Sequence, residues 1–207
     1  ERAAFIRARV CAGDRARGEH FLQSIQPFVW RRSLDFGVIE EVREISARIR
    51  DHFAQGASLG PGYDLKRGRG GIREVEFFAQ IQQMVHGGRD PSVRAPATLD
   101  ALEVLRTAGK IDGADAEALS EAYRLFRTIE HRAQMVEDAQ THLLPLDREA
   151  LDGVARLHGL GSGDELIELL RPHVVRAEKL FHSLAPDREG GELRWGEVHD
   201  PIAYRMG

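Results

Sequence analysis

The sequence lacks the features that would place it in several common classes of protein. Its single cysteine, Cys11, excludes an internal disulfide framework and fits a reducing compartment. No apolar run approaches the roughly twenty residues that span a bilayer, and the first residues carry no signal-peptide core. With 29 Lys and Arg against 33 Asp and Glu, the net charge is −4, so no basic excess favours nucleic-acid binding. We therefore expect a cytoplasmic protein with no nucleic-acid and no membrane partner.

Apolar residues recur at helical spacing over most of the 207 residues, and no segment shows a convincing strand pattern. The sequence predicts an all-α fold, a multi-helix bundle with a buried central helix after a Gly-rich turn. We expect residues 1–185 to form a helical domain and residues 186–207 an irregular tail. Beyond the N-terminal segment the expected helices span about 34–55, 72–85, 98–108, 115–138, 147–158 and 164–184, the last two capped by Asp147 and Asp164.

The N-terminal segment is expected to be helical and interrupted. Cys11 lies in an apolar-periodic stretch and is interpreted as a small core residue. The turn that begins at Phe21 should end before Pro27, because the residue preceding a proline is disfavoured in the α region. Phe28, Val29 and Trp30 should then anchor this segment in the core.

The stretch from Tyr63 to Phe78 mixes charges, glycines and apolar residues more densely than any other. In an extended piece side chains alternate, so Asp64 and Lys66 should share one side, opposite to Tyr63 and Leu65. The glycines, among them Gly70 and Gly71, allow positive φ and close approach, and a helix start offers unpaired N–H groups. These features predict a seat for phosphate. A purely structural interpretation stays open, in which the glycines form a tight helix start and Asp64 and Lys66 a surface ion pair.

The helix that follows should be central and mostly buried, because apolar residues occupy too much of its circumference for a surface helix. Four polar residues form one stripe along it and need partners in a network, another domain or a ligand. They are Arg73, Glu76, Gln80 and Gln83. Glu74 lies on a different face, in the first turn, where the helix dipole favours a carboxylate.

The long helix over 115–138 carries a second polar row beside its apolar stripe. The row consists of Arg127, His131 or Glu130, Gln134 and Asp138. A structural role is the favoured interpretation for the histidine, because no second His or Cys stands at a metal-ligand spacing.

Three stretches, in this order, resemble one family, the bifunctional glutamine synthetase adenylyltransferase/adenylyl-removing enzyme. The first is Ile25-Gln26-Pro27-Phe28-Val29-Trp30-Arg31-Arg32, followed closely by Leu34-Asp35-Phe36. The second joins Asp64-Leu65-Lys66 to Gly70-Gly71-Ile72-Arg73-Glu74-Val75-Glu76-Phe77. The third joins Glu130-His131-Arg132-Ala133-Gln134-Met135 to Gln140-Thr141-His142-Leu143-Leu144-Pro145. The resemblance covers about residues 20–145.

The resemblance implies a function in the control of nitrogen assimilation. In that family each of two halves pairs a catalytic nucleotidyltransferase domain with a helical domain, and this chain looks like the helical domain of the amino-terminal, adenylyl-removing half. The implied reaction is phosphorolysis of the adenylyl–tyrosine bond on glutamine synthetase, which gives ADP. The implied partners are glutamine synthetase, the PII signal protein and the upstream catalytic domain of the same polypeptide, and the implied cofactors of the full-length enzyme are Mg²⁺ and ATP or ADP.

One departure limits what this chain is expected to do alone. Nucleotidyltransferases of this type hold two metal ions with an Asp-x-Asp pair after a Gly-Ser or Gly-Gly turn, and no such pair follows such a turn in this sequence. We expect the pair on residues upstream of Glu1, so this chain should be inactive alone, with no catalytic residue, no metal ligand and no firmly bound cofactor. The residues expected to bind nucleotide or phosphate, or to line the cleft, are Asp64, Lys66, Gly70, Gly71, Arg73, Glu74 and Glu76.

Two other functions stay open. The second hypothesis is a regulatory or scaffold module that docks glutamine synthetase or PII protein without touching nucleotide. It could instead be the matching domain of PII uridylyltransferase, although the sequence carries no His-Asp hydrolase motif.

Overall fold

The computed structural model describes residues 2–31 and 58–184. Its elements are α1 (Arg2–Ile6), α2 (Arg15–Val29), α4 (Ile72–His86), the 3-10 turn η1 (Pro91–Val93), α5 (Thr98–Thr107), α6 (Gly113–Glu137), α7 (Arg148–Leu157) and α8 (Gly163–Ser183). The all-α class is confirmed, since the only β pairing in the described part is an isolated antiparallel bridge between Asp64 and Leu143. The helix expected over 34–55 and the expected tail over 186–207 lie outside the described residues.

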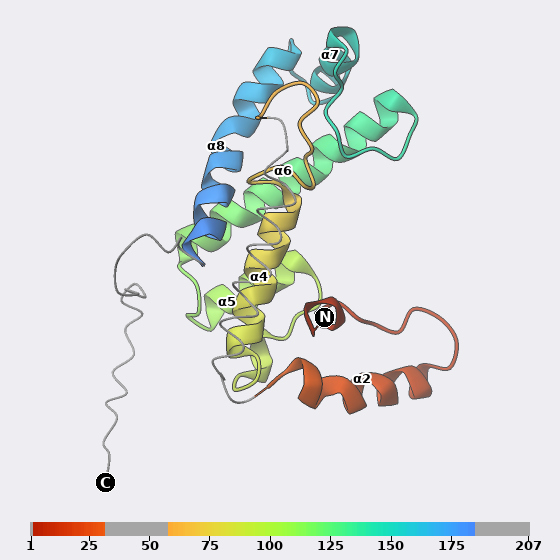
Figure 1. Cartoon of the computed structure of the whole chain (residues 1–207), viewed down its shortest axis with the longest axis vertical. Coiled ribbons are helices and arrows are strands. Elements are labelled where there is room, and N and C mark those ends of the chain that lie inside the picture. Colours follow the sequence, from red (N-terminus) through yellow and green to blue (C-terminus); the bar gives the residue numbers. More distant parts are fainter. Residues whose placement is uncertain (1, 32–57, 185–207) are drawn as a thin grey trace.

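The bundle is built around α4 and α6. Helix α6 packs against α5, α7 and α8, and α4 packs against α5, α6 and α8. Figure 1 shows α7 and α2 at opposite ends of the molecule, with α4 between them. The main core includes side chains of the connecting segments, because Tyr63, Leu65 and Leu144 are almost completely buried beside helical residues such as Phe126. The glycine stretch is therefore part of the core and not an appended loop.

Helix α4 is the expected central helix. No residue from Gly70 to Gly88 is exposed, and the apolar side of the helix faces both cores of the bundle. Ile72, Val75 and Phe78 belong to the main core, whereas Ile81 and Met84 pack against α1, α2 and α8 in a second, smaller core. The prediction of a buried central helix after a Gly-rich turn is confirmed. No helix in the described ranges is long and apolar enough to cross a membrane.

Helix boundaries follow the local capping signals closely. Asp112 caps α6 and Asp147 caps α7, each accepting a backbone N–H of the first turn. The cap expected at Asp164 was wrong. Ser162 adopts the extended conformation of an N-cap and its hydroxyl accepts the Glu165 N–H, so Asp164 already lies in the first turn of α8.

Of three expectations for the N-terminal segment, two were wrong and the third was right only in part. Helix α2 runs through Pro27, because a proline near the C-terminal end removes one hydrogen bond while the Trp30 N–H still reaches the Gln26 carbonyl at 2.7 Å. Cys11 is exposed, outside any helix. Of the three expected anchors only Val29 is fully buried, whereas Phe28 keeps 43% of its surface exposed.

Candidate functional site

The segment from Tyr63 to Lys66 has the alternation that the sequence predicts. Tyr63 and Leu65 are buried, whereas Asp64 and Lys66 are partly exposed. The Tyr63 hydroxyl donates to the Arg69 carbonyl at 2.6 Å and so closes the turn over its own ring. Burial, together with the carboxylates of Glu74, Glu178 and Asp64, keeps this phenol neutral by raising its pKa well above the usual value. Tyr63 therefore stabilises the turn from the buried side.

The carboxylate of Asp64 holds the backbone of the turn. Its Oδ1 atom accepts the N–H groups of Lys66 at 2.9 Å and of Arg67 at 2.8 Å, which is an Asx-type turn. The Lys66 carbonyl in turn accepts the Arg73 N–H at 3.0 Å. Within the described residues the Lys66 ammonium makes no hydrogen bond or ion pair. The structure thus fixes the Lys66 backbone.

The glycines approach the protein's own backbone. Gly70 has a φ of +72°, and a Cβ added to it would lie 2.1 Å from the Val174 carbonyl oxygen of α8. A Cβ on Gly71 would lie 2.6 Å from the Leu65 carbonyl oxygen. These close approaches explain both glycines without a ligand. The contribution of Gly70 and Gly71 to a binding site stays a prediction, and it would be indirect.

The expected row of unpaired N–H groups at the start of α4 is wrong. The Ile72 N–H donates to the Leu65 carbonyl at 2.9 Å, and the N–H of Gly71 donates to the Gly68 carbonyl at 2.9 Å. The Arg73 and Gly70 N–H groups are also taken, by the Lys66 carbonyl and the Glu74 carboxylate. The turn satisfies the orphan donors of the helix internally. Any phosphate at this place must be bound by side chains.

Glu74 is a buried carboxyl beneath the turn. Its Oε2 atom accepts the Gly70 N–H at 2.9 Å. Burial raises the pKa of Glu74 to about 7; the Gly70 N–H opposes this rise, Glu178 adds to it, and Arg69 lowers it. The first-turn position was predicted, but the burial was not. Glu74 acts on the turn from inside the protein, and its contact with a ligand stays a prediction.

The polar stripe on α4 finds partners within the chain. Glu76 accepts from Arg7 Nη1 at 2.8 Å and from the Tyr123 hydroxyl at 3.3 Å, so it joins α4 to α6 and to the end of α1. Gln83 is buried and donates to the carbonyls of Val93 and Ala95. Arg73 and Gln80 are partly exposed. The stripe is thus only partly buried, and its contact with another domain or a nucleotide stays a prediction.

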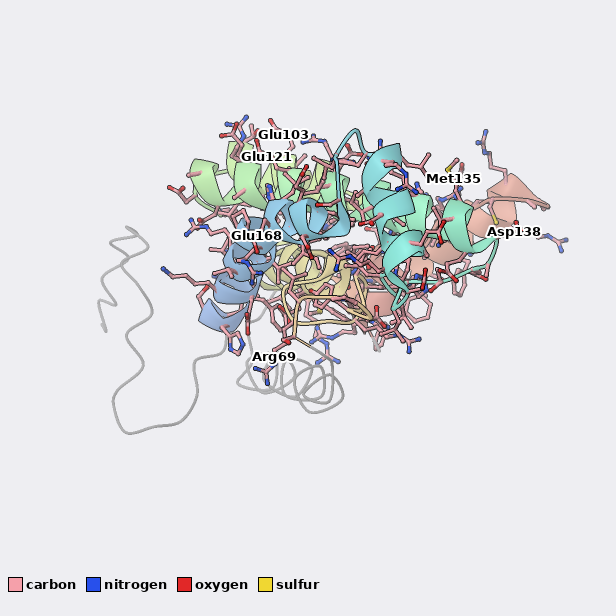
Figure 2. All side chains as sticks on the ribbon, turned by 90° about the horizontal axis from the view of Figure 1, so that it is seen from above. Arg69, Glu103, Glu121, Met135, Asp138 and Glu168 are labelled. Atoms are coloured by element: carbon pink, nitrogen blue, oxygen red, sulfur yellow. The ribbon has the colours of Figure 1, made fainter. Side chains whose placement is uncertain are left out.

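Basic side chains surround the turn. Lys66 and Arg73 are partly exposed and Arg67 and Arg69 are exposed, while the nearest acidic groups of the stretch are bound to backbone N–H groups or to Arg7. Arg69 lies 4.0 Å from Glu178 of α8. Figure 2 shows Arg69 on the side of the bundle opposite to Glu103 and Glu121. An anionic ligand at this face stays a prediction.

The structure brings the second and third sequence stretches together. The Leu65 N–H donates to the His142 carbonyl at 2.8 Å, and the Leu144 N–H donates to the Tyr63 carbonyl at 2.9 Å. Asp64 and Leu143 form the bridge between these bonds. Two segments that are far apart in the sequence, residues 63–65 and 142–144, thus pair in extended conformation. Lys66 directly follows the first of them.

Sequence reasoning missed the buried carboxylate under this pairing. Glu130 is completely buried on α6; its Oε1 atom lies 2.6 Å from Nδ1 of His142, and its Oε2 atom accepts from Arg127. His131 is exposed and lies 3.3 Å from Arg127. The signal was present, because Glu130 follows the core residue Phe126 by one helical turn.

The described residues hold no group of three His, Cys, Asp or Glu side chains suited to a metal ion. The expected Mg²⁺ and nucleotide therefore stay predictions for a longer protein that contains this chain.

Comparisons with known proteins show which family this chain is similar to. A family described as GlnD PII-uridylyltransferase matches residues 41–185. A bifunctional glutamine synthetase adenylyltransferase/adenylyl-removing enzyme of Caulobacter vibrioides is 49% identical over 162 residues, which cover 78% of this chain and 16% of that protein. The protein of the same name from Bradyrhizobium diazoefficiens is 45% identical over 190 residues, with 90% and 19% covered. That from Rhizobium meliloti is 44% identical over 207 residues, with 97% and 21% covered. The chain thus spans about a fifth of the length of these relatives.

Proposed function

Because the chain belongs to the family described as GlnD PII-uridylyltransferase, we propose that it is the helical domain beside a nucleotidyltransferase core and forms one wall of its cleft. The relatives compared above bear the name of the adenylyltransferase/adenylyl-removing enzyme at 44–49% identity. Their names favour this enzyme over the uridylyltransferase. The three sequence stretches favour its adenylyl-removing half, where the reaction would be phosphorolysis of an adenylyl–tyrosine bond on glutamine synthetase.

The observation that carries the proposal is the state of Lys66. Its N–H and carbonyl are both bonded within the turn, so the backbone is held in place, while its ammonium makes no hydrogen bond or ion pair among the described residues. Asp64 accepts two backbone N–H groups of the turn and forms no ion pair with Lys66 among the described residues. A lysine on a fixed backbone, without an ion pair among the described residues and with Arg67 and Arg69 beside it, suits a phosphate whose charge must be offset during transfer.

This geometry gives the residues of the turn different roles in the proposed function. Lys66, with Arg67 and Arg69 beside it, would neutralise phosphate charge on this wall of the cleft, and Asp64 would hold the turn. Mg²⁺ would be held by an Asp-x-Asp pair on the catalytic domain, and it would align the attacking and leaving oxygens. This chain alone would bind nucleotide weakly and catalyse nothing. The PII signal protein would act as regulator of the complete enzyme.

The proposal is tested by calorimetric titration of the 207-residue chain with ADP. Lys66→Ala should weaken ADP binding about tenfold, since a charge-assisted phosphate contact contributes about 1.5 kcal/mol or more. Lys110→Ala is the matched control, because Lys110 is also partly exposed but lies beyond α5. Equal ADP affinity of the wild-type chain and Lys66→Ala would remove Lys66 from the site.

A second candidate function is docking on glutamine synthetase without any nucleotide contact. The fully occupied N–H groups at the start of α4 favour it, because they remove the backbone part of the expected phosphate seat. Capture of the chain by purified glutamine synthetase that survives both Lys66→Ala and Arg67→Ala would support docking alone. Gly71→Ala is unsuitable for this test, since the added Cβ would collide with the Leu65 carbonyl and disturb the fold.

A further inference from the structure

Glu130 is linked to the backbone next to Lys66 by two hydrogen bonds, one to the His142 side chain and one from Leu65 to the His142 carbonyl. The carboxylate is completely buried in the middle of α6, where an unpaired charge would cost several kcal/mol. Two donors satisfy it, Arg127 from the preceding turn and Nδ1 of His142, which lies 2.6 Å from Oε1. With Glu130 as a carboxylate, Oε1 accepts and Nδ1 of His142 is the donor of this hydrogen bond. The contact fixes both the tautomer and the position of the imidazole.

The backbone of His142 is hydrogen-bonded to the turn, so fixing the imidazole also restricts the position of the turn. Its carbonyl accepts the Leu65 N–H at 2.8 Å, directly before Lys66. On its other side the turn is held by α4, where the Ile72 N–H donates to the Leu65 carbonyl at 2.9 Å. Leu65 is therefore fixed between the first turn of α4 and the segment that contains His142. Of these two supports, only the segment that contains His142 depends on a buried ionised group, which is Glu130.

A second contact holds the same segment and provides a comparison. Gln134, one turn after Glu130 on α6, donates from Nε2 to the Thr141 carbonyl at 3.0 Å. This is a hydrogen bond between neutral groups, and such a bond contributes about half as much as one to an ionised group. The Glu130–His142 contact is thus the stronger of the two attachments of residues 141–144 to α6.

We propose that Glu130, acting through His142, is the positioning residue that fixes the Lys66 turn for its anionic ligand. The inference rests on the proposed function for the ligand, but the positioning itself concerns only this chain. Neither Glu130 nor His142 touches the ligand. Their role is to keep the Leu65 backbone, and with it the adjoining backbone of Lys66, in one place.

Amide hydrogen exchange of the 207-residue chain tests the positioning without any ligand. His142→Ala should speed exchange of the Leu65 and Leu144 N–H groups about tenfold, which is the loss of one charge-assisted hydrogen bond. His142→Asn should restore slow exchange, because an amide nitrogen can replace Nδ1 as donor to Glu130. Should His142→Ala fold poorly, Glu130→Gln with His142→Ala gives the same comparison, because it removes the contact without leaving a buried charge.

The matched control is Asp115→Asn, which removes the ion pair between α6 and Arg176 of α8 and has no contact with the turn. It should leave exchange at Leu65 unchanged. Wild-type exchange rates in His142→Ala would overturn the inference. Equal acceleration in Asp115→Asn would do so as well, because the effect would then reflect global stability only.

ADP titration separates this inference from the proposed function. His142→Ala should weaken ADP binding about tenfold, and His142→Asn should restore it. If the wild-type chain binds no ADP, the proposed function fails, while the exchange data still decide the positioning role. If His142→Asn restores slow exchange but not ADP affinity, the imidazole itself contacts the ligand and the positioning role is overturned.

Discussion

Gly70 lies directly against the backbone of Val174, so close that a Cβ on Gly70 would stand 2.1 Å from the Val174 carbonyl oxygen. The contact joins the turn before α4 to the middle of α8. It explains why the chain needs a glycine here, and the reason is packing between distant segments. The same glycine has a φ of +72°, which residues with a Cβ rarely adopt.

Gly70→Ala should therefore destabilise the fold by about 3 kcal/mol, since steric collision adds to the cost of positive φ. Gly109→Ala is the control, because Gly109 has a φ of +65° but open space around it, so about 1 kcal/mol is expected. Urea denaturation of the two variants measures both values. Equal losses would show that the contact with Val174 adjusts at little cost.

Glu74→Gln should change how stability depends on pH. The folded-state pKa of Glu74 is raised to about 7 from a usual value near 4.5, mainly by burial. Between these values the folded chain binds more protons than the unfolded chain, so the stability that this group contributes is complete below about pH 4.5 and is lost as the pH rises through about 7. The loss amounts to at most about 3 kcal/mol.

Glu74→Gln should remove this loss, because the amide carbonyl still accepts the Gly70 N–H and carries no charge. The variant should match the wild-type chain near pH 4.5 and exceed it in stability above pH 7. Other carboxyl groups titrate in both proteins, so the difference between the two curves of unfolding free energy against pH isolates Glu74. Parallel curves would contradict the buried, proton-binding role.

Gln83→Leu should cost about 2–4 kcal/mol of stability, although leucine fits an apolar surrounding. Gln83 donates to the carbonyls of Val93 at 2.8 Å and of Ala95 at 2.7 Å, and the substitution leaves both without this donor. Gln80→Leu is the control, because Gln80 is partly exposed on the same stripe. Thermal unfolding compares the two. A loss at Gln83 no larger than at Gln80 would mean that water replaces the amide.

Local signals predicted more of the fold than of the site. Apolar periodicity and capping residues gave α5, α6 and α7 to within a few residues, since these depend on neighbours in the sequence. The alternation from Tyr63 to Lys66 was predicted for the same reason. The contact of Gly70 with Val174 and that of Glu130 with His142 were not, because they join segments whose packing no periodicity specifies.

The site also differed from the prediction because polar groups of the chain form hydrogen bonds with one another. A helix start in isolation has unpaired N–H groups, but here the carbonyls of Leu65 and Lys66 fold back onto α4 and bond to them. The stripe on α4 likewise needed partners, as predicted, and Glu76 found them in Arg7 and Tyr123. Sequence reasoning identified the groups that need partners but not which partners they have.

Glu76 provides the last prediction, because two roles for it give different results. As an internal link it joins Arg7 to α4 in an ion pair whose arginine side chain is 44% exposed. A double-mutant cycle with Arg7→Ala and Glu76→Gln should then give a coupling of about 0.5–1 kcal/mol that decreases in high salt. Affinity for ADP should stay at the wild-type value in both single variants. If Glu76→Gln leaves stability unchanged but weakens ADP binding, Glu76 lies at the nucleotide. Loss of a purely internal ion pair would lower stability and leave ADP affinity unchanged.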